Sequence, residues 1–110
     1  MIRHCAFFRF HQDIPEAEIM KLLADLNPLV GTCPGLVSLE LGRNNSEEGF
    51  DHGFLYGLVA LFSDKAALNT YLRHPDHVAF SEKLISKLAT SPEDDILVFD
   101  VEVSRTSNQI

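Results

Sequence analysis

Several residue types are scarce in this sequence. It has no tryptophan, two cysteines and two methionines, and its nine lysines and arginines face sixteen aspartates and glutamates, which gives a net charge of −7. The basic residues are scattered singly along the chain and form no patch. A negative net charge without a basic patch repels nucleic-acid phosphates and anionic lipid headgroups. We therefore expect neither a nucleic acid nor a membrane surface as a partner.

Long apolar runs and export signals are missing as well. The most apolar stretch, residues 53–63, has roughly half the residues that a membrane-spanning helix needs. The first residues enter an alternating strand pattern directly, without the apolar segment and cleavage site of a signal peptide. We expect no membrane span and a cytoplasmic location, where Cys5 and Cys33 would remain reduced as small buried side chains.

Motifs that hold cofactors are equally scarce. The sequence has no glycine-rich phosphate-binding loop, no set of closely spaced zinc ligands and no nucleophile elbow. His74 and His77 flank a helix break and lack an obvious third ligand, which makes them a weak metal signal. We therefore predict that the protein uses no cofactor and no metal ion.

The composition that remains is that of an ordinary folded domain. The chain has 110 residues, of which 45% are hydrophobic and 23% are charged, close to the average for soluble globular proteins. A chain of this length forms one domain around one core. We expect this domain to occupy residues 2–103, followed by a C-terminal tail at residues 104–110.

Periodicity divides the domain into strands and helices. Apolar residues alternate in four segments and recur at helical spacing in three others. Asp13–Glu16 and Asp64 have the residue types that begin helices, and Pro75 begins a third helical segment. The expected elements, in chain order, are a strand at residues 2–10, a helix from Asp13–Glu16 to residues 27–28, strands at 36–41 and 54–62, helical segments after Asp64 and from Pro75, and a strand at 96–103.

This order predicts an α+β fold. Strand, helix, strand, strand, helix pair and strand make the βαββαβ pattern of a ferredoxin-like sandwich with a four-stranded antiparallel sheet. The helices cover one face of such a sheet, yet the first, third and fourth strands carry apolar residues on both faces. Soluble monomers seldom expose more than a few hundred Å² of contiguous apolar surface. We therefore expect a homodimer in which the free sheet faces pack together and form a dimeric α/β barrel.

The connection between the second and third strands has two open interpretations. Residues 42–53 are polar and acidic, and the segment is longer than the usual hairpin loop. It is either a lid over a binding site or a solvated connection without a chemical role.

A set of short motifs resembles a known family. The motifs are the run at residues 69–80 with its Tyr, His-Pro and His, then Ile2-Arg3-His4, Cys33-Pro34-Gly35 and Phe99-Asp100. In this order they resemble the stress-responsive A/B barrel (Dabb) domain family over residues 2–103. The resemblance implies a dimeric α+β barrel with a cavity between each sheet and its helices. Many members have no assigned activity, so the implied function is that of a stress-responsive protein that binds a small apolar or aromatic ligand in this cavity.

A minority of the family, the olivetolic acid cyclase type, closes linear polyketides into aromatic rings without a cofactor. By resemblance, the tyrosine and histidine of its acid-base chemistry correspond to Tyr71 and His77. An aldol closure needs a base with a near-neutral pKa and a hydroxyl donor that holds the carbonyl oxygen. His77 follows Pro75 at a positive helix end, which favours a neutral imidazole. The alternative function is therefore a cofactor-independent cyclase or lyase that uses this pair.

Three further residues are candidate ligand-binding residues, namely His4, Tyr56 and His74. Tyr56 stands where cyclase-type members have a third-strand histidine, and this difference disfavours polyketide closure. Structural roles remain open for two of the candidate residues. Tyr71 is then a packing residue, and His4 is a hydrogen-bonded core residue. For His74 we prefer a backbone hydrogen bond that ends one helix and begins the next. Dimeric barrels that oxidise quinols or degrade haem are disfavoured by the lack of tryptophan.

Overall fold

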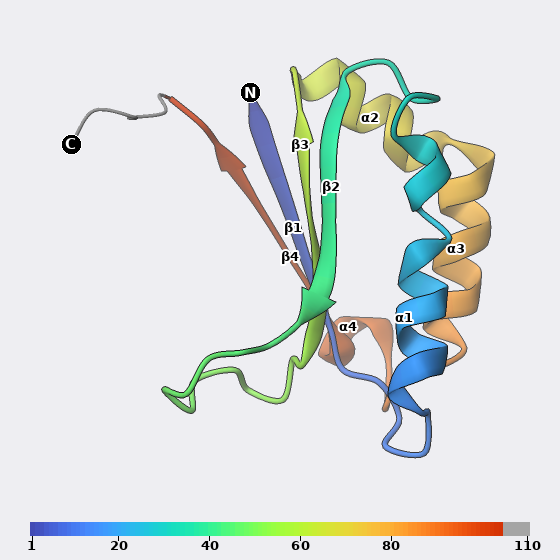
Figure 1. Ribbon diagram of the computed structural model, residues 1–110, viewed down its shortest axis with the longest axis vertical. Coiled ribbons are helices and arrows are strands. Elements are labelled where there is room, and N and C mark those ends of the chain that lie inside the picture. The colour runs from blue at the N-terminus through green and yellow to red at the C-terminus, as the bar shows by residue number, and fades with distance from the viewer. Residues whose placement is uncertain (105–110) are drawn as a thin grey trace.

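The computed structural model describes residues 1–104, so most of the expected tail at residues 104–110 lies outside the described residues. Three helices cover one face of a four-stranded antiparallel sheet with the strand order β2-β3-β1-β4 (Figure 1). The elements in chain order are β1 (Ile2–Phe8), α1 (Glu16–Ala24), the short 3-10 helix η1 (Asn27–Leu29), β2 (Leu36–Arg43), β3 (Tyr56–Phe62), α2 (Lys65–Arg73), α3 (Pro75–Ile85), α4 (Pro92–Asp95) and β4 (Ile96–Glu102). The predicted ferredoxin-like α+β fold is confirmed.

The core lies between the sheet and the helix layer. Its sheet side consists of the inward positions of β1 and β3, because alternate residues of a strand point to the same face. The helix side comes from the apolar stripes of α1, α2 and α3. The most deeply buried side chains include Phe62, Leu23, Leu26, Leu29, Leu68 and Tyr71.

Two of the predicted helix starts are confirmed and one is wrong. The Asp64 side chain accepts a hydrogen bond from the Ala67 amide at 2.8 Å and caps α2. His74 caps α3, because its Nδ1 accepts from the Asp76 amide at 3.0 Å, as we preferred from the sequence. Asp13 does not cap α1: the residue before that helix is Pro15, and no side chain accepts a hydrogen bond from its first turn.

The strand β2 contains a bulge that its sequence pattern conceals. Leu36 pairs with Phe62 and Ser38 pairs with the next residue, Leu61, so Val37 is the extra residue. Strict alternation over residues 36–41 would place Leu36 and Leu39 on opposite faces of the sheet. The bulge shifts the register by one, so both side chains point inward.

One residue of the acidic run before β4 is buried despite its charge. Residues 92–95 form α4, and Asp95 is only 2% exposed. Burial raises the pKa of Asp95, but amide hydrogens of Thr90 and Ser91 and the Arg9 guanidinium outweigh it and hold the pKa below its ordinary value. Arg9 Nε donates to Asp95 Oδ1 at 3.1 Å. Asp95 therefore joins the start of β4 to the end of β1.

The sheet face away from the helices, here called the free face, is largely apolar. Its β4 residues Leu97, Phe99 and Val101 are 48%, 64% and 40% exposed. Residues 44–55, between β2 and β3, project from this side of the sheet (Figure 1). None of the helices in residues 1–104 has the length and hydropathy needed to cross a membrane.

Candidate functional site

Three predicted site residues meet on the inner side of the sheet. His4 comes from β1, Tyr71 from the last turn of α2 and His77 from the first turn of α3. The break at His74-Pro75 turns the chain between the two helices, since a residue before proline disfavours helical angles. This turn brings His77 over the Tyr71 ring, with 4.5 Å between the ring centroids.

Tyr71 is the centre of this cluster. Its ring centroid lies 6.1 Å from that of His4 and 5.0 Å from that of Phe62. The side chain is fully buried, and its hydroxyl has no hydrogen-bond partner among the described residues. Burial, with a contribution from Cys33, raises the pKa of Tyr71 far above its ordinary value. The phenol therefore stays protonated, and its O–H group is free to donate a hydrogen bond.

His77 is half-buried beside this phenol. Burial lowers the pKa of His77, the neighbouring His4 and His74 lower it further, and the Leu72 backbone acts in the opposite direction. We predicted a neutral imidazole from the positive end of α3. The direction agrees, but burial is the leading cause.

His4 has a partner that the sequence argument did not identify as a site residue. Its Nδ1 lies 2.6 Å from Oδ1 of Asp100, which faces it across the pairing of β1 with β4. An ionised carboxylate only accepts hydrogen bonds, so Nδ1 carries the proton and Nε2 of the neutral ring is an acceptor. One feature of the sequence could have identified Asp100 as a partner of His4. The alternation of β4 places Asp100 on the inward face of the sheet.

The other two candidate ligand-binding residues lie outside this cluster or are already engaged. Tyr56 pairs with Phe8, whereas His4 pairs with Ala60, so about 13 Å of strand separates them. The Tyr56 ring packs instead against Phe10, with centroids 5.9 Å apart. His74 borders the cluster, but its Nδ1 accepts the amide hydrogen that caps α3.

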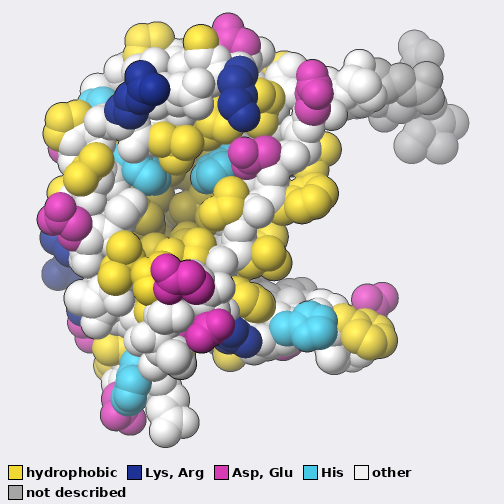
Figure 2. All heavy atoms as spheres, turned by 180° about the vertical axis from the view of Figure 1, so that it is seen from behind, with side chains coloured by type: hydrophobic (Ala, Val, Ile, Leu, Met, Phe, Trp, Pro, Cys, Tyr) yellow, Lys and Arg dark blue, Asp and Glu magenta, His cyan; other side chains and the backbone are white. Residues whose placement is uncertain are grey.

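The helices leave the inner side of β4 partly open, because the inward-facing Val98 is 51% exposed and the side chain of Asp100, the partner of His4, is 34% exposed. Hydrophobic side chains line a hollow on this side of the molecule, with histidine and acidic side chains at its rim (Figure 2). Among residues 1–104, no group of three or more His, Cys, Asp or Glu side chains is placed to hold a metal ion.

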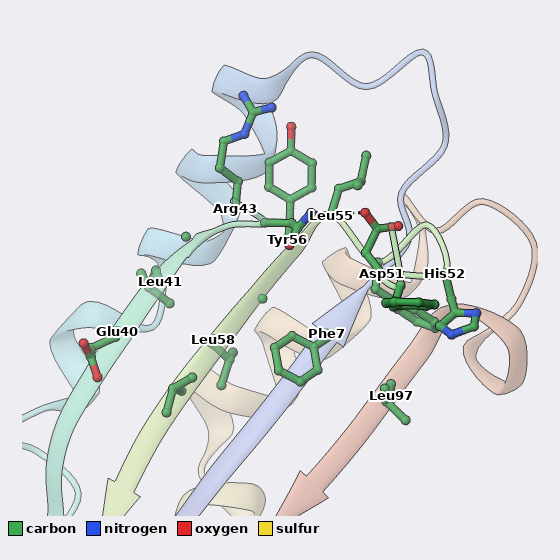
Figure 3. Close-up of a pocket in the computed structure, with 16 residues that line it drawn as sticks. Phe7, Glu40, Leu41, Arg43, Asp51, His52, Leu55, Tyr56, Leu58 and Leu97 are labelled. Atoms are coloured by element: carbon green, nitrogen blue, oxygen red, sulfur yellow. Dashed lines mark hydrogen bonds between the residues drawn. The ribbon is translucent and has the colours of Figure 1, made fainter. Parts of the chain in front are cut away.

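A separate pocket lies on the other side of the sheet. It has a volume of about 540 Å³ and opens on the free face beside residues 44–55 (Figure 3). Of the predicted site residues only Tyr56 lines it, and in Figure 3 the Tyr56 side chain points away from Phe7 and Leu97. The cavity expected between sheet and helices and the pocket under residues 44–55 are therefore different places.

Comparison with known proteins agrees with this fold. The family model of the Stress responsive A/B Barrel Domain matches residues 2–103. The stress-response A/B barrel domain-containing protein HS1 of Arabidopsis thaliana is 24% identical over 106 residues, which are 96% of this chain and 93% of that protein. Olivetolic acid cyclase of Cannabis sativa is 21% identical over 81 residues, 74% of this chain and 80% of the enzyme.

The solved structures include a dimeric ferredoxin-like protein of unknown function from Jannaschia sp. CCS1. It is 30% identical with a TM-score of 0.84, and the match covers 93% of this chain and 98% of that one. The predicted resemblance is thereby confirmed: the chain belongs to the stress-responsive A/B barrel (Dabb) domain family.

Proposed function

We propose that this protein binds a small apolar or aromatic ligand between its sheet and its helices. The observation that carries the proposal is the buried Tyr71 hydroxyl, which has no hydrogen-bond partner in the described part of the chain. A buried polar group without a hydrogen bond costs about 1–3 kcal/mol. A ligand oxygen that accepts from this hydroxyl recovers that free energy, so the ligand should carry a carbonyl or hydroxyl group.

The surroundings of Tyr71 favour an uncharged, planar molecule. Phe62 and Phe80 supply apolar ring surface, and the lowered pKa of His77 makes its imidazole neutral at pH 7. The ligand enters from the hollow beside β4, and because Tyr71 is fully buried, side chains at the floor of the hollow must move aside. Rotation of His77, which is half-buried, is the smallest such movement.

The binding experiment compares the protein with Tyr71→Phe, which keeps the ring and removes the donor. Phenols, naphthols and aromatic ketones are titrated while the amide resonances of α2 and α3 are followed by NMR. We expect one of these classes to bind and Tyr71→Phe to weaken its binding about tenfold, the loss of one hydrogen bond. Tyr56→Phe is the matched control and should bind normally. Equal affinity in Tyr71→Phe, or no binding by any class, contradicts the proposal.

The second candidate function is a cofactor-independent cyclase or lyase. It is favoured by the 2.6 Å contact between His4 and Asp100, since a carboxylate that fixes an imidazole tautomer also stabilises the protonated ring. In such a reaction Nε2 of His4 or a nitrogen of His77 takes a proton from the substrate, and Tyr71 donates to the carbonyl oxygen on which charge develops. Olivetolic acid cyclase, one of the relatives, is named for chemistry of this kind.

Turnover separates the two functions. A cyclase or lyase should lose about 10²-fold or more in kcat on His77→Ala or Tyr71→Phe, while binding of product changes little. A binding protein shows no turnover to lose. A role in the stress response and a cytoplasmic location stay predictions.

We also propose that the protein is a homodimer joined through its free faces. Leu97, Phe99 and Val101 form exposed apolar surface that helices do not cover. The similar Jannaschia protein is described as dimeric. Sedimentation velocity at micromolar concentration should show a species of twice the chain mass, and a single subunit there contradicts this part of the proposal.

A further inference from the structure

The segment at residues 44–55, here called the arm, creates a pocket that one chain leaves open. The arm leaves the end of β2, projects beyond the free face and returns to β3 (Figure 1), and it is the projection at the lower right of Figure 2. Between the arm and the sheet lies the pocket of about 540 Å³ (Figure 3). Its apolar lining includes Phe7, Phe50, Phe54, Leu55, Val59 and Leu97.

A glycine shapes the floor of this pocket. Phe7 on β1 is paired with Gly57 on β3. A Cβ atom at Gly57 would lie 2.5 Å from Cδ1 of Phe7 and 2.8 Å from the Ala6 carbonyl oxygen. The absence of a side chain thus allows the Phe7 ring to lie across β3 and present its face to the pocket.

The arm is held in position by contacts with the body of the domain. Arg9 Nη1 donates to the His52 carbonyl at 3.1 Å, and its guanidinium lies 4.6 Å from the centroid of the Phe54 ring. Within the arm, Asn44 Nδ2 donates to Asp51 Oδ2 at 3.1 Å. Phe50 nevertheless remains 76% exposed. A fixed arm with an exposed aromatic residue is preorganised to bind a protein surface.

Charge on the free face restricts how a second copy can lie on it. The middle positions of the four strands, paired across the sheet, are Glu40, Val59, Cys5 and Phe99. Suppose first that the two-fold axis crosses the strands at this row, in the plane between the two sheets. Each strand then lies over the same strand of the second copy, and Glu40 of one copy faces Glu40 of the other. Two carboxylates in that position repel each other.

An axis parallel to the strands avoids this repulsion. Because the strand order is β2-β3-β1-β4, the turned copy places its β4 over β2 of the first. Glu40 then faces Phe99. Leu97, which lies in the same cross-strand row as Phe7 and Gly57, comes over the pocket.

We propose that the arm is a clasp for a second copy of this chain. The start of β4 from the second copy occupies the pocket, with Leu97 over Gly42, the β2 residue of that row and part of the pocket lining, and Phe50 of the first copy closes over it. Two-fold symmetry repeats the contact, so each copy holds the other. The inference rests on the homodimer of the proposed function and adds the element that secures it.

The first experiment measures the dimer dissociation constant by sedimentation velocity over a dilution series. Phe50→Ala should raise the dissociation constant about 10- to 30-fold, as truncation of a buried interface aromatic does. Leu72→Ala on α2, which also removes an exposed apolar side chain, is the matched control and should leave the constant unchanged. Circular dichroism checks that both variants are folded.

The second experiment tests the orientation by cross-linking. Glu40→Cys and Phe99→Cys are made in separate chains on a Cys5→Ser background, mixed, and treated with a bis-maleimide that spans ~10 Å, the distance between packed sheets. We expect links between Glu40→Cys and Phe99→Cys chains to dominate over links between two Glu40→Cys chains. The Cys5→Ser parent reports any reaction of Cys33.

Each contrary outcome has a definite meaning. A monomeric wild-type protein overturns both the clasp and the homodimer. A dimer with the same dissociation constant in Phe50→Ala overturns the clasp alone. Predominant links between two Glu40→Cys chains overturn the placement of β4 in the pocket. A monomer that binds an aromatic compound against Phe7 and Leu97, seen by NMR, assigns the pocket to a ligand and also overturns the clasp.

Discussion

His4 and Asp100 face each other across the pairing of β1 with β4, and Nδ1 of the imidazole lies 2.6 Å from Oδ1 of the carboxylate. His4 is buried, while the Asp100 side chain is 34% exposed at the edge of the sheet. The pair therefore joins the interior of the site to its solvent edge. It fixes the donor and acceptor nitrogens of the one histidine that β1 contributes.

The first prediction concerns this tautomer. Asp100→Asn replaces a group that only accepts by one that also donates, so Nδ1 of His4 should no longer be held as the protonated nitrogen. Two-dimensional ¹⁵N–¹H NMR of the imidazole should show one tautomer in the wild type and a mixture in the variant, with a loss of about 1 kcal/mol in the free energy of unfolding. Glu102→Gln, two residues further on the same face of β4, is the control. A single, unchanged tautomer in Asp100→Asn would mean that the contact does not fix the ring.

The sequence predicted the elements whose signals are local. Alternation identified the strands, and the side chains of Asp64 and His74 marked the helix starts that they cap. The cluster of Tyr71 and His77 followed from the resemblance and not from periodicity. Each of these signals lies within a few residues of the structure that it determines.

What the sequence did not predict depends on residues far apart along the chain. The burial of Asp95 could not be predicted, because nothing near it in the sequence shows that Arg9, 86 positions away, reaches it. Asp100 is a similar case, since its partner His4 is 96 positions away. A lid at residues 42–53 was one of two interpretations, but the lining of the pocket under the arm could not be predicted, because β1, β2, β3 and β4 all contribute to it.

The second prediction concerns the stability of Tyr71→Phe. Removing a hydroxyl from a buried tyrosine usually destabilises a protein, because a hydrogen bond is lost. Here the hydroxyl has no partner among residues 1–104, so the variant should be about 1–3 kcal/mol more stable than the wild type in urea denaturation. Tyr71→Ala, which also removes the ring, should cost about 3–5 kcal/mol. A loss above 1 kcal/mol in Tyr71→Phe would reveal a partner for the hydroxyl.

The third prediction is a dependence of stability on pH. Burial holds the pKa of His77 below the ordinary value of 6.5, so in mildly acidic solution the unfolded chain binds a proton that the folded chain does not. The free energy of unfolding should therefore fall as the pH decreases from about 7.5 to 5.5, by at most about 1.4 kcal/mol per pH unit from this group. His77→Gln, which stays neutral, should reduce that slope, and His52→Gln in the exposed arm should not. Parallel slopes for the wild type and His77→Gln would show that the imidazole is not shielded from water.

The fourth prediction links Asp95 to the arm. Its carboxylate binds Arg9, and the same guanidinium binds the His52 carbonyl in the arm. Asp95→Asn removes the charge that orients the guanidinium, so hydrogen exchange followed by mass spectrometry should show faster exchange in residues 44–55. Asp94→Asn is the matched control, because Asp94 contacts Arg9 through its backbone carbonyl, which the substitution leaves in place.

The contact between Asp95 and Arg9 also predicts that the position of the arm depends on pH in acid solution. Because the pKa of Asp95 is lowered in the fold, its stabilising effect is complete above the ordinary value of 3.8 and is lost as the pH falls below it. Exchange in the arm of the wild type should therefore resemble that of Asp95→Asn only at a pH below about 4. If Asp95→Asn left exchange in residues 44–55 unchanged, the arm would owe its position to its internal hydrogen bonds alone, and the clasp would not depend on Arg9.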